Sequence, residues 1–213
     1  MGTLLKVPYI KQQKNSPKCG AACAAMIIEF YKGEYIDLNS IWDHVKDISP
    51  ELNREYCKTH KIGTYISENH FNCCIVKYTN LKDFLIFCNT NGIAPILNHK
   101  SYADRKGGHF SVVKNISSNT VLINDPENKK NNSVSYDSLA LLSKKNEDIN
   151  SNDEIGGNTA ITPILNKFTP ISIPCPNCGR SIDISFSRAA NSSESRIVDA
   201  DLCLYCDIFH TNL

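Results

Sequence analysis

The sequence lacks the long apolar run that a membrane-spanning helix needs. No window approaches 18 consecutive apolar residues, which is about the shortest run that can cross a bilayer as a helix. The apolar stretch in residues 1–13 is too short for a secretory signal peptide. We therefore expect a cytoplasmic protein that does not insert into a membrane.

The sequence also lacks an excess of charge of either sign. Its 23 lysines and arginines nearly balance 22 aspartates and glutamates, for a net charge of +1. This balance argues against bulk nucleic acid or an anionic membrane surface as a partner. The apolar content of 41% is ordinary for a globular protein, and 213 residues suffice for one domain and a small appendage.

Cysteine, in contrast, is abundant, with ten residues in the chain. Four of them form two Cys-x-x-Cys pairs near the C-terminus, whereas Cys23 and the adjacent Cys73 and Cys74 read as structural. These spacings indicate metal and thiol chemistry in a reducing compartment, with a disulfide framework as the minor alternative.

Helical patterns come first along the chain and strand patterns follow. The predicted helices are residues 19–31 (ended by Gly33), 38–48, 51–59 and a segment that Asn80 caps. The predicted strands are residues 93–98, 109–116, 120–124, 133–136 and 159–165. Residues 145–158 are polar and predict a linker. This order predicts an α+β fold in which helices pack on an antiparallel sheet.

Cys19 opens a helical stretch that carries no charge before Glu29. A thiolate at a helix N-terminus is stabilised by the helix dipole and by backbone N–H groups that have no partner in the helix. Cys19 is therefore a candidate nucleophile, and it requires a base and a group that orients the base.

Of the six histidines, His109 is the strongest candidate base. It follows two glycines and begins an apolar strand, and Asp125 ends the next strand sixteen residues later. In a hairpin the two side chains would lie at the same end, so that Asp125 could orient the imidazole while the other ring nitrogen faces the thiol. His99, at the end of the preceding strand, is the rival base.

Three motifs together resemble those of the double-glycine leader peptidases, the papain-like cysteine peptidases that mature bacteriocins. They are Val7-Pro8-Tyr9 followed by glutamine, the Cys19-Gly20 segment with its helix, and the His109 and Asn124-Asp125-Pro126 segments. The resemblance covers roughly residues 5–165. It implies a papain-like fold with Cys19 as nucleophile, His109 as general base and acid, and Asp125 as the orienting residue.

The resemblance also implies a glutamine that completes the oxyanion hole with the backbone N–H of Cys19. Gln13 stands six residues before Cys19, the usual spacing in papain-like enzymes, and is the preferred candidate. Gln12 fits better when counted from Val7-Pro8-Tyr9, since the loop before Cys19 could hold one extra residue. No transporter or ATPase segment follows, so we expect a stand-alone form.

The C-terminal cysteines have the spacing of a zinc ribbon. Cys175 and Cys178 form one knuckle, and Cys203 and Cys206 form a second after 24 intervening residues. Four thiolates make a closed, structural site for one zinc ion, which would drive the folding of so short a segment. We therefore divide the chain into a peptidase domain, residues 1–168, and a zinc ribbon, residues 169–213. Ile182, Ile184, Phe186 and Ile197 would form a hairpin between the knuckles.

These features predict a cysteine peptidase that cleaves a peptide or protein through a Cys-His-Asp triad and a thioester. Two alternatives stay open: a protein deamidase or transglutaminase that uses the same triad, and an inactive scaffold that binds a protein. The arginines of the ribbon are offset by acidic residues, which disfavours nucleic acid and favours a protein partner there.

Overall fold

An antiparallel sheet organises the part of the chain that the structure describes. The structure is a computed structural model that describes residues 4–49, 53–102, 107–144, 156–164, 166, 168–192 and 196–211. The sheet has the strand order β12-β11-β3-β8-β4-β5-β6-β7. Its strands are β3 (Cys73–Tyr78), β4 (Ile96–Lys100), β5 (Gly108–Ile116), β6 (Thr120–Asp125), β7 (Lys129–Ser135), β8 (Thr159–Pro163), β11 (Val198–Cys203) and β12 (Ile208–Thr211).

The other described elements are helices and two small hairpins. The helices are α1 (Cys19–Lys32), α2 (Leu38–Val45), α3 (Thr59–Asn69), α4 (Leu81–Thr90), α5 (Tyr136–Ser143) and α6 (Ser185–Ala190). The hairpins are β1 (Lys46–Ser49) with β2 (Arg54–Cys57), and β9 (Ser172–Pro174) with β10 (Ser181–Asp183). No helix in the described ranges is both long and apolar enough to cross a membrane.

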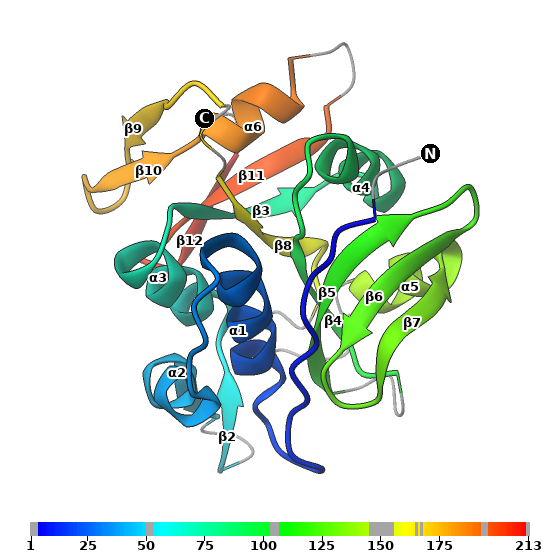
Figure 1. The fold of residues 1–213 in the computed structure, drawn as a ribbon. Helices are drawn as coiled ribbons and strands as arrows, with labels where there is room; N and C mark the ends of the chain where they lie inside the picture. Colours follow the sequence, from blue (N-terminus) through cyan, green and yellow to red (C-terminus); the bar gives the residue numbers. More distant parts are fainter. Residues whose placement is uncertain are drawn as a thin grey trace.

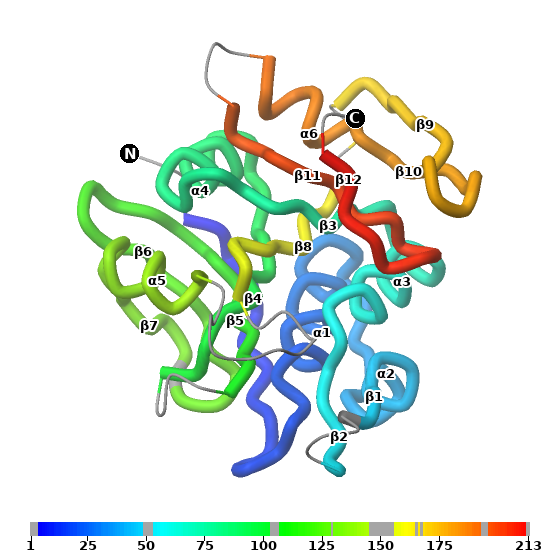
Figure 2. The backbone as a smooth tube through the Cα atoms, turned by 180° about the vertical axis from the view of Figure 1, so that it is seen from behind, coloured from blue at the N-terminus to red at the C-terminus, as the bar shows by residue number. Residues whose placement is uncertain are grey.

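Helices cover both faces of the sheet (Figures 1 and 2). Successive strand residues point to opposite faces, and both sets are apolar. Ile75, Ile96, Val112 and Ile161 pack with α1, α2 and α3. Val76, Leu97, Val113 and Ala160 pack with α4, α5 and α6. The predicted α+β class with an antiparallel sheet is therefore confirmed, with helical layers on both sides.

The predicted helix that begins at Cys19 is confirmed. α1 is buried from Cys19 to Ile28, and Gly33 ends it in the left-handed region (φ 71°), with its N–H bonded to the Glu29 carbonyl. Gly20 is required for close packing, because a Cβ at this position would lie 2.8 Å from Cys57 Cβ. The small residues after Cys19 thus allow the helix to lie deep in the core.

The N-terminal segment runs along the sheet between α1 and strands β5 and β6 (Figure 1). The Leu5 N–H donates to the Lys114 carbonyl (3.0 Å). The Asn124 side-chain amide donates to the carbonyls of Val7 (3.3 Å) and Pro8 (2.9 Å). The first and third sequence motifs, which lie more than a hundred residues apart, are therefore in direct contact.

The predicted helix over residues 51–59 is wrong. The chain forms β2 instead, which pairs with β1 from Lys46↔Cys57 to Ser49↔Arg54, and α3 begins only at Thr59. The pairing with β1 supplies backbone hydrogen bonds that outweigh a weak helical pattern. The helix predicted over residues 38–48 ends earlier for the same reason, since Lys46 already belongs to β1.

Residues from the predicted zinc ribbon extend the main sheet. β11 pairs antiparallel with β3, and β12 pairs with β11. The turn after Cys203 also contacts α3, where Thr64 Oγ1 donates to the Leu204 carbonyl (3.2 Å), and Lys58, the residue before α3, pairs with Asp207 (3.0 Å). The division at residue 168 stays a prediction. Residues after 168 form hydrogen bonds with β3 and α3 of the preceding segment.

The hairpin predicted between the two knuckles is also wrong. Ile182 lies in β10, whereas Ile184 and Phe186 lie at the start of α6. The Asp183 carboxylate accepts a hydrogen bond from the Ser185 N–H (2.8 Å) and so favours the beginning of a helix. Residues 145–155 of the predicted linker lie outside the described residues.

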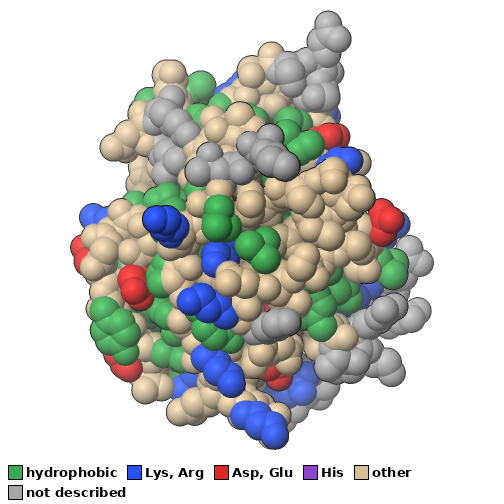
Figure 3. Space-filling view, turned by 45° about the vertical axis from the view of Figure 1, so that its right-hand side comes forward, with side chains coloured by type: hydrophobic (Ala, Val, Ile, Leu, Met, Phe, Trp, Pro, Cys, Tyr) green, Lys and Arg blue, Asp and Glu red, His purple; other side chains and the backbone are tan. Residues whose placement is uncertain are grey.

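The surface is of mixed polarity. On the face drawn in Figure 3, hydrophobic side chains form small separate groups among polar atoms. The exposed large hydrophobic residues come from distant parts of the chain, including Leu4, Tyr35, Leu141 and Tyr205. Scattered exposure of this kind is normal for a globular protein.

Candidate active site

Cys19 lies at the first position of α1 and is buried, with 8% of its surface exposed. The residue before it, Lys18, makes no side-chain hydrogen bond to cap the helix. The first-turn N–H groups of Gly20 and Ala21 instead act on the thiol of Cys57 and lower its pKa, against the larger effect of burial. The N-terminus of α1 therefore faces two sulfur atoms.

Cys57 was not predicted as part of this region. Its thiol also donates to the Pro17 carbonyl (3.5 Å). Burial, and then the neighbouring Cys19, raise the pKa of Cys57, so that it is a neutral thiol at physiological pH. No spacing in the sequence could have identified it, because β2 reaches α1 only through the tertiary fold.

His109 and Asp125 are hydrogen-bonded. His109 Nε2 lies 2.8 Å from Asp125 Oδ1, and both side chains are buried. Oδ1 also accepts hydrogen bonds from the backbone N–H groups of Glu127 (3.0 Å) and Asn128 (3.3 Å), and Oδ2 accepts one from the Asn128 side chain (2.9 Å). Burial raises the pKa of Asp125, but these hydrogen bonds outweigh it and hold the pKa below its usual value.

Cys19 also interacts with His109 and affects its pKa. Burial lowers the pKa of His109, but hydrogen bonds to Asp125 and Cys19 oppose this effect and raise the pKa to about 10. Since Nε2 is bonded to Asp125, Nδ1 is the ring nitrogen left for the thiol. The structure thus brings together Cys19, His109 and Asp125, the thiol, imidazole and carboxylate that the sequence predicted to act together.

The two candidate glutamines differ in environment. Gln12 is 4% exposed, its backbone N–H donates to the Pro126 carbonyl (2.9 Å), and its Nε2 donates to the Ser16 carbonyl (2.8 Å). Gln13, which the spacing favoured, is exposed. Asn15, at φ 58°, marks a turn in the loop between Gln12 and Cys19.

The rival base, His99, lies beside His109. Its Nδ1 is 2.7 Å from the Lys100 carbonyl oxygen and its Nε2 is 2.9 Å from Ser111 Oγ. Complete burial, and then the neighbouring His109, lower the pKa of His99 to about 3. Because both ring nitrogens are engaged away from Cys19, His99 is poorly placed to act as the base.

The four C-terminal cysteines form a cluster. Cys175 Sγ lies 3.7 Å from Cys206 Sγ, Cys178 Sγ lies 3.6 Å from Cys203 Sγ, and all four sulfurs are within 4.8 Å of one another. A tetrahedral zinc–thiolate site has sulfurs about 3.8 Å apart, so the arrangement is compatible with a metal ion. None of the ten cysteines forms a disulfide in the structure.

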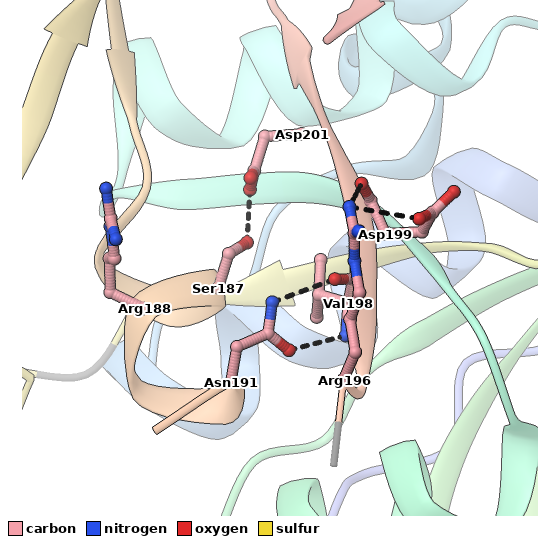
Figure 4. A pocket seen from close by; sticks show the side chains of 7 residues that line it. All are labelled: Ser187, Arg188, Asn191, Arg196, Val198, Asp199 and Asp201. Atoms are coloured by element: carbon pink, nitrogen blue, oxygen red, sulfur yellow. Dashed lines mark hydrogen bonds and ion pairs between the residues drawn. The ribbon is translucent and has the colours of Figure 1, made fainter. Parts of the chain in front are cut away.

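A cavity elsewhere in the molecule contains no member of this site. Its lining comes from α6, β11 and residues next to them (Figure 4): Ser187, Arg188, Asn191, Arg196, Val198, Asp199 and Asp201. Its polar side chains bond largely to one another, as in the contacts of Ser187 with Asp201 and of Arg196 with Asp199.

Comparison with solved structures shows that the fold is that of known peptidase domains. A double-glycine-motif protease from an AMS/PCAT transporter, in complex with the leader peptide, matches with a TM-score of 0.51 and 18% identity over 76% of this chain and 94% of that chain. The peptidase domain of Streptococcus ComA, a bifunctional ABC transporter of a quorum-sensing pathway, matches with a TM-score of 0.54 and 17% identity over 75% and 99%. A C39-like peptidase from Bacillus anthracis matches with a TM-score of 0.54 and 12% identity over 78% and 98%.

No curated protein matches the chain. The sequence model of the Peptidase C39 family matches residues 6–142, which hold Cys19, His109 and Asp125 but not the C-terminal cysteines. This match spans well over half of the chain and agrees with the folds above. The chain therefore belongs to the Peptidase C39 family, and it is a cysteine peptidase of the papain-like type.

Proposed function

We propose that the protein hydrolyses a peptide bond of a peptide or protein substrate through Cys19, His109 and Asp125. The observation that carries this proposal is the buried His109–Asp125 hydrogen bond, together with the Cys19 thiol that interacts with His109. A thiolate beside an imidazolium is a strong nucleophile at neutral pH. The raised pKa of His109, about 10, favours this ion pair.

The proposed reaction has two halves, the formation of a thioester on Cys19 and the hydrolysis of that thioester. The Cys19 thiolate attacks the carbonyl carbon of the scissile bond, and His109 then gives its proton to the departing amine, leaving a thioester. His109 next takes a proton from water, which attacks the thioester carbonyl, releases the acid and regenerates the Cys19 thiolate beside the protonated His109. Asp125 keeps the imidazole oriented and stabilises its positive charge throughout.

We assign the oxyanion hole to the Gln12 side chain and the backbone N–H of Cys19. A side chain that stabilises the oxyanion must be held rigidly, and Gln12 is fixed at its backbone by Pro126 and at its amide by Ser16. Its Nε2 carries two hydrogens, of which the Ser16 carbonyl takes one. The exposed Gln13 has no comparable support.

A peptide is the proposed substrate because one solved relative was crystallised with a leader peptide. We infer that the chain acts in a reducing compartment, the cytoplasm, since a thiol nucleophile and ten free cysteines suit one. We further propose that the four C-terminal cysteines hold one structural zinc ion, because four thiols at these separations fit a tetrahedral site. Docking of a protein partner on residues 169–213 stays a prediction.

The first prediction concerns the nucleophile. Cys19→Ala is expected to abolish cleavage while the fold persists, because it removes only the sulfur. The wild-type protein and the variant are incubated with a peptide library, and new N-termini are identified by mass spectrometry. Cleavage by Cys19→Ala would contradict the proposal. A mass increase of about one dalton at glutamine, with no cleavage, would instead indicate a deamidase.

The second prediction separates the two glutamines. Gln12→Ala is expected to lower kcat by about 100-fold to 1,000-fold, the usual cost of removing one oxyanion donor. Gln13→Ala, one residue away but exposed, is the matched control and should stay within about twofold of wild type. Equal losses in both variants, or a larger loss in Gln13→Ala, would refute the assignment.

The third prediction concerns pH. The active pair requires a protonated His109, whose pKa is raised, so activity should persist through neutral pH and fall as the pH rises toward about 10. Asp125→Asn removes the charge that contributes to this raised pKa. The alkaline limb of kcat/KM should then move down by about one pH unit or more. Asp137→Asn, at the exposed start of α5, is the control, and an unchanged limb in Asp125→Asn would exclude this role.

The fourth prediction concerns the metal. Purified wild-type protein is expected to contain one zinc ion per chain by elemental mass spectrometry, and Cys178→Ser to contain much less. The melting temperature of Cys178→Ser should fall by about 5 °C or more, because β11 and β12 belong to the main sheet. Cys88→Ala, a buried cysteine on α4, should keep its zinc. Full zinc occupancy in Cys178→Ser would contradict this site.

A further inference from the structure

His99 is the closest aromatic neighbour of His109. The two residues face each other across the β4–β5 ladder, and their ring centroids lie 5.3 Å apart with an angle of 74° between the planes. Residues directly opposite each other in an antiparallel pair share one face of the sheet. Tyr102, just beyond β4, adds a second ring whose centroid is 6.0 Å from that of His109. His109 therefore packs against a cluster of two aromatic rings, His99 and Tyr102, which also contact each other.

The hydrogen bonds of His99 fix its tautomer. A backbone carbonyl only accepts, so the 2.7 Å contact with the Lys100 oxygen requires a proton on Nδ1. Nε2 must then be the acceptor in the 2.9 Å contact with Ser111, whose hydroxyl donates. Both nitrogens are satisfied in the neutral ring, and both His99 and Ser111 have no exposed surface.

A second proton on His99 would be unfavourable for two reasons. It would force the Ser111 hydroxyl to turn from donor to acceptor, and it would place a second positive charge beside His109. Burial acts in the same direction and lowers the pKa of His99 to about 3. His99 is thus an aromatic ring that stays uncharged while its neighbour is charged.

Four titratable groups among the described residues contact or interact with His109. Cys19 lies on α1, Asp125 on β6, His99 on β4 and Tyr102 beyond it. Burial raises the pKa values of Tyr102 and of Cys23, which lies one turn further along α1, so both are neutral. Positive charge in this group of residues can therefore reside only on His109.

We propose that His99 is a positioning residue, a permanently neutral aromatic ring that orients His109 and stabilises its charged form next to Cys19. A cation that lies over the face of an aromatic ring, within about 6 Å of the centroid, is attracted to it, and edge-to-face contacts restrict how the neighbouring ring can turn. This role rests on the proposed function, since it assumes that Cys19 and His109 form the ion pair. In this role His99 transfers no proton and does not contact the substrate.

The test measures how fast iodoacetamide alkylates Cys19 across pH, by mass spectrometry of the Cys19 peptide, in the full-length protein. His99→Phe keeps a neutral ring, whereas His99→Leu fills the space without one. Near neutral pH, His99→Phe should stay within about threefold of wild type, and His99→Leu should fall by about tenfold or more. The acidic end of the reactive range should also move up in His99→Leu, because a less stable His109 cation favours the ion pair less. His44→Leu, at an exposed position on α2, should match wild type.

A folded His99→Leu variant with the wild-type pH profile would overturn the inference, as would a loss in His99→Phe equal to that in His99→Leu. Ring nitrogen NMR of the wild-type protein provides a test that does not depend on the folding of a variant. The wild-type signal of His99 is identified as the one that is lost in His99→Phe. This signal should show a proton on Nδ1 and no titration between about pH 5 and about pH 9. Titration in that range would also overturn the inference.

The same experiment separates this inference from the function on which it rests. Wild-type Cys19 that reacts no faster at neutral pH than the buried Cys23 would contradict the proposed function, and the role of His99 with it. Fast reaction of wild-type Cys19 with no effect of His99→Leu would contradict the role of His99 alone.

Discussion

The buried charge of Asp125 is the constraint on which the rest of the site depends. A carboxylate without exposed surface is costly unless hydrogen bonds replace its lost hydration, and Asp125 accepts them from His109, Glu127 and Asn128. The turn after β6 supplies two backbone donors, and β5 supplies the imidazole. The same turn also positions the N-terminal segment, because Gln12 bonds to the carbonyl of Pro126, the residue after Asp125. One short turn thus connects the base and the proposed oxyanion donor.

The parts of the site that depend on local sequence could be predicted. Cys19 opens a helix because the residues after it are small and apolar, and the His109–Asp125 pair follows from a hairpin whose strands have clear patterns. The choice between Gln12 and Gln13 could not be made in this way. It depends on a turn at Asn15 and on a hydrogen bond to Pro126, which lies over a hundred residues away. The position of Cys57 likewise depends on a hairpin that the sequence pattern did not indicate.

The C-terminal segment shows the same limit on a larger scale. The spacing of Cys175, Cys178, Cys203 and Cys206 predicts a cluster of four thiols, and the structure places these sulfurs together. Nothing in that spacing predicts that β11 inserts beside β3, since the pairing joins segments more than a hundred residues apart. Short motifs report the chemistry of a site, whereas the neighbours of a strand depend on the packing of the whole chain.

The order of the sheet has a consequence for solubility. The match to the family ends at residue 142, yet β3 has its sheet neighbours, β8 and β11, only beyond that point. β3 is apolar and almost entirely buried, and without these neighbours both of its sides would present unpaired N–H and C=O groups. Such an edge is a template for pairing with other chains. The strands that follow the family region therefore protect the peptidase from self-association, whatever else the four cysteines do.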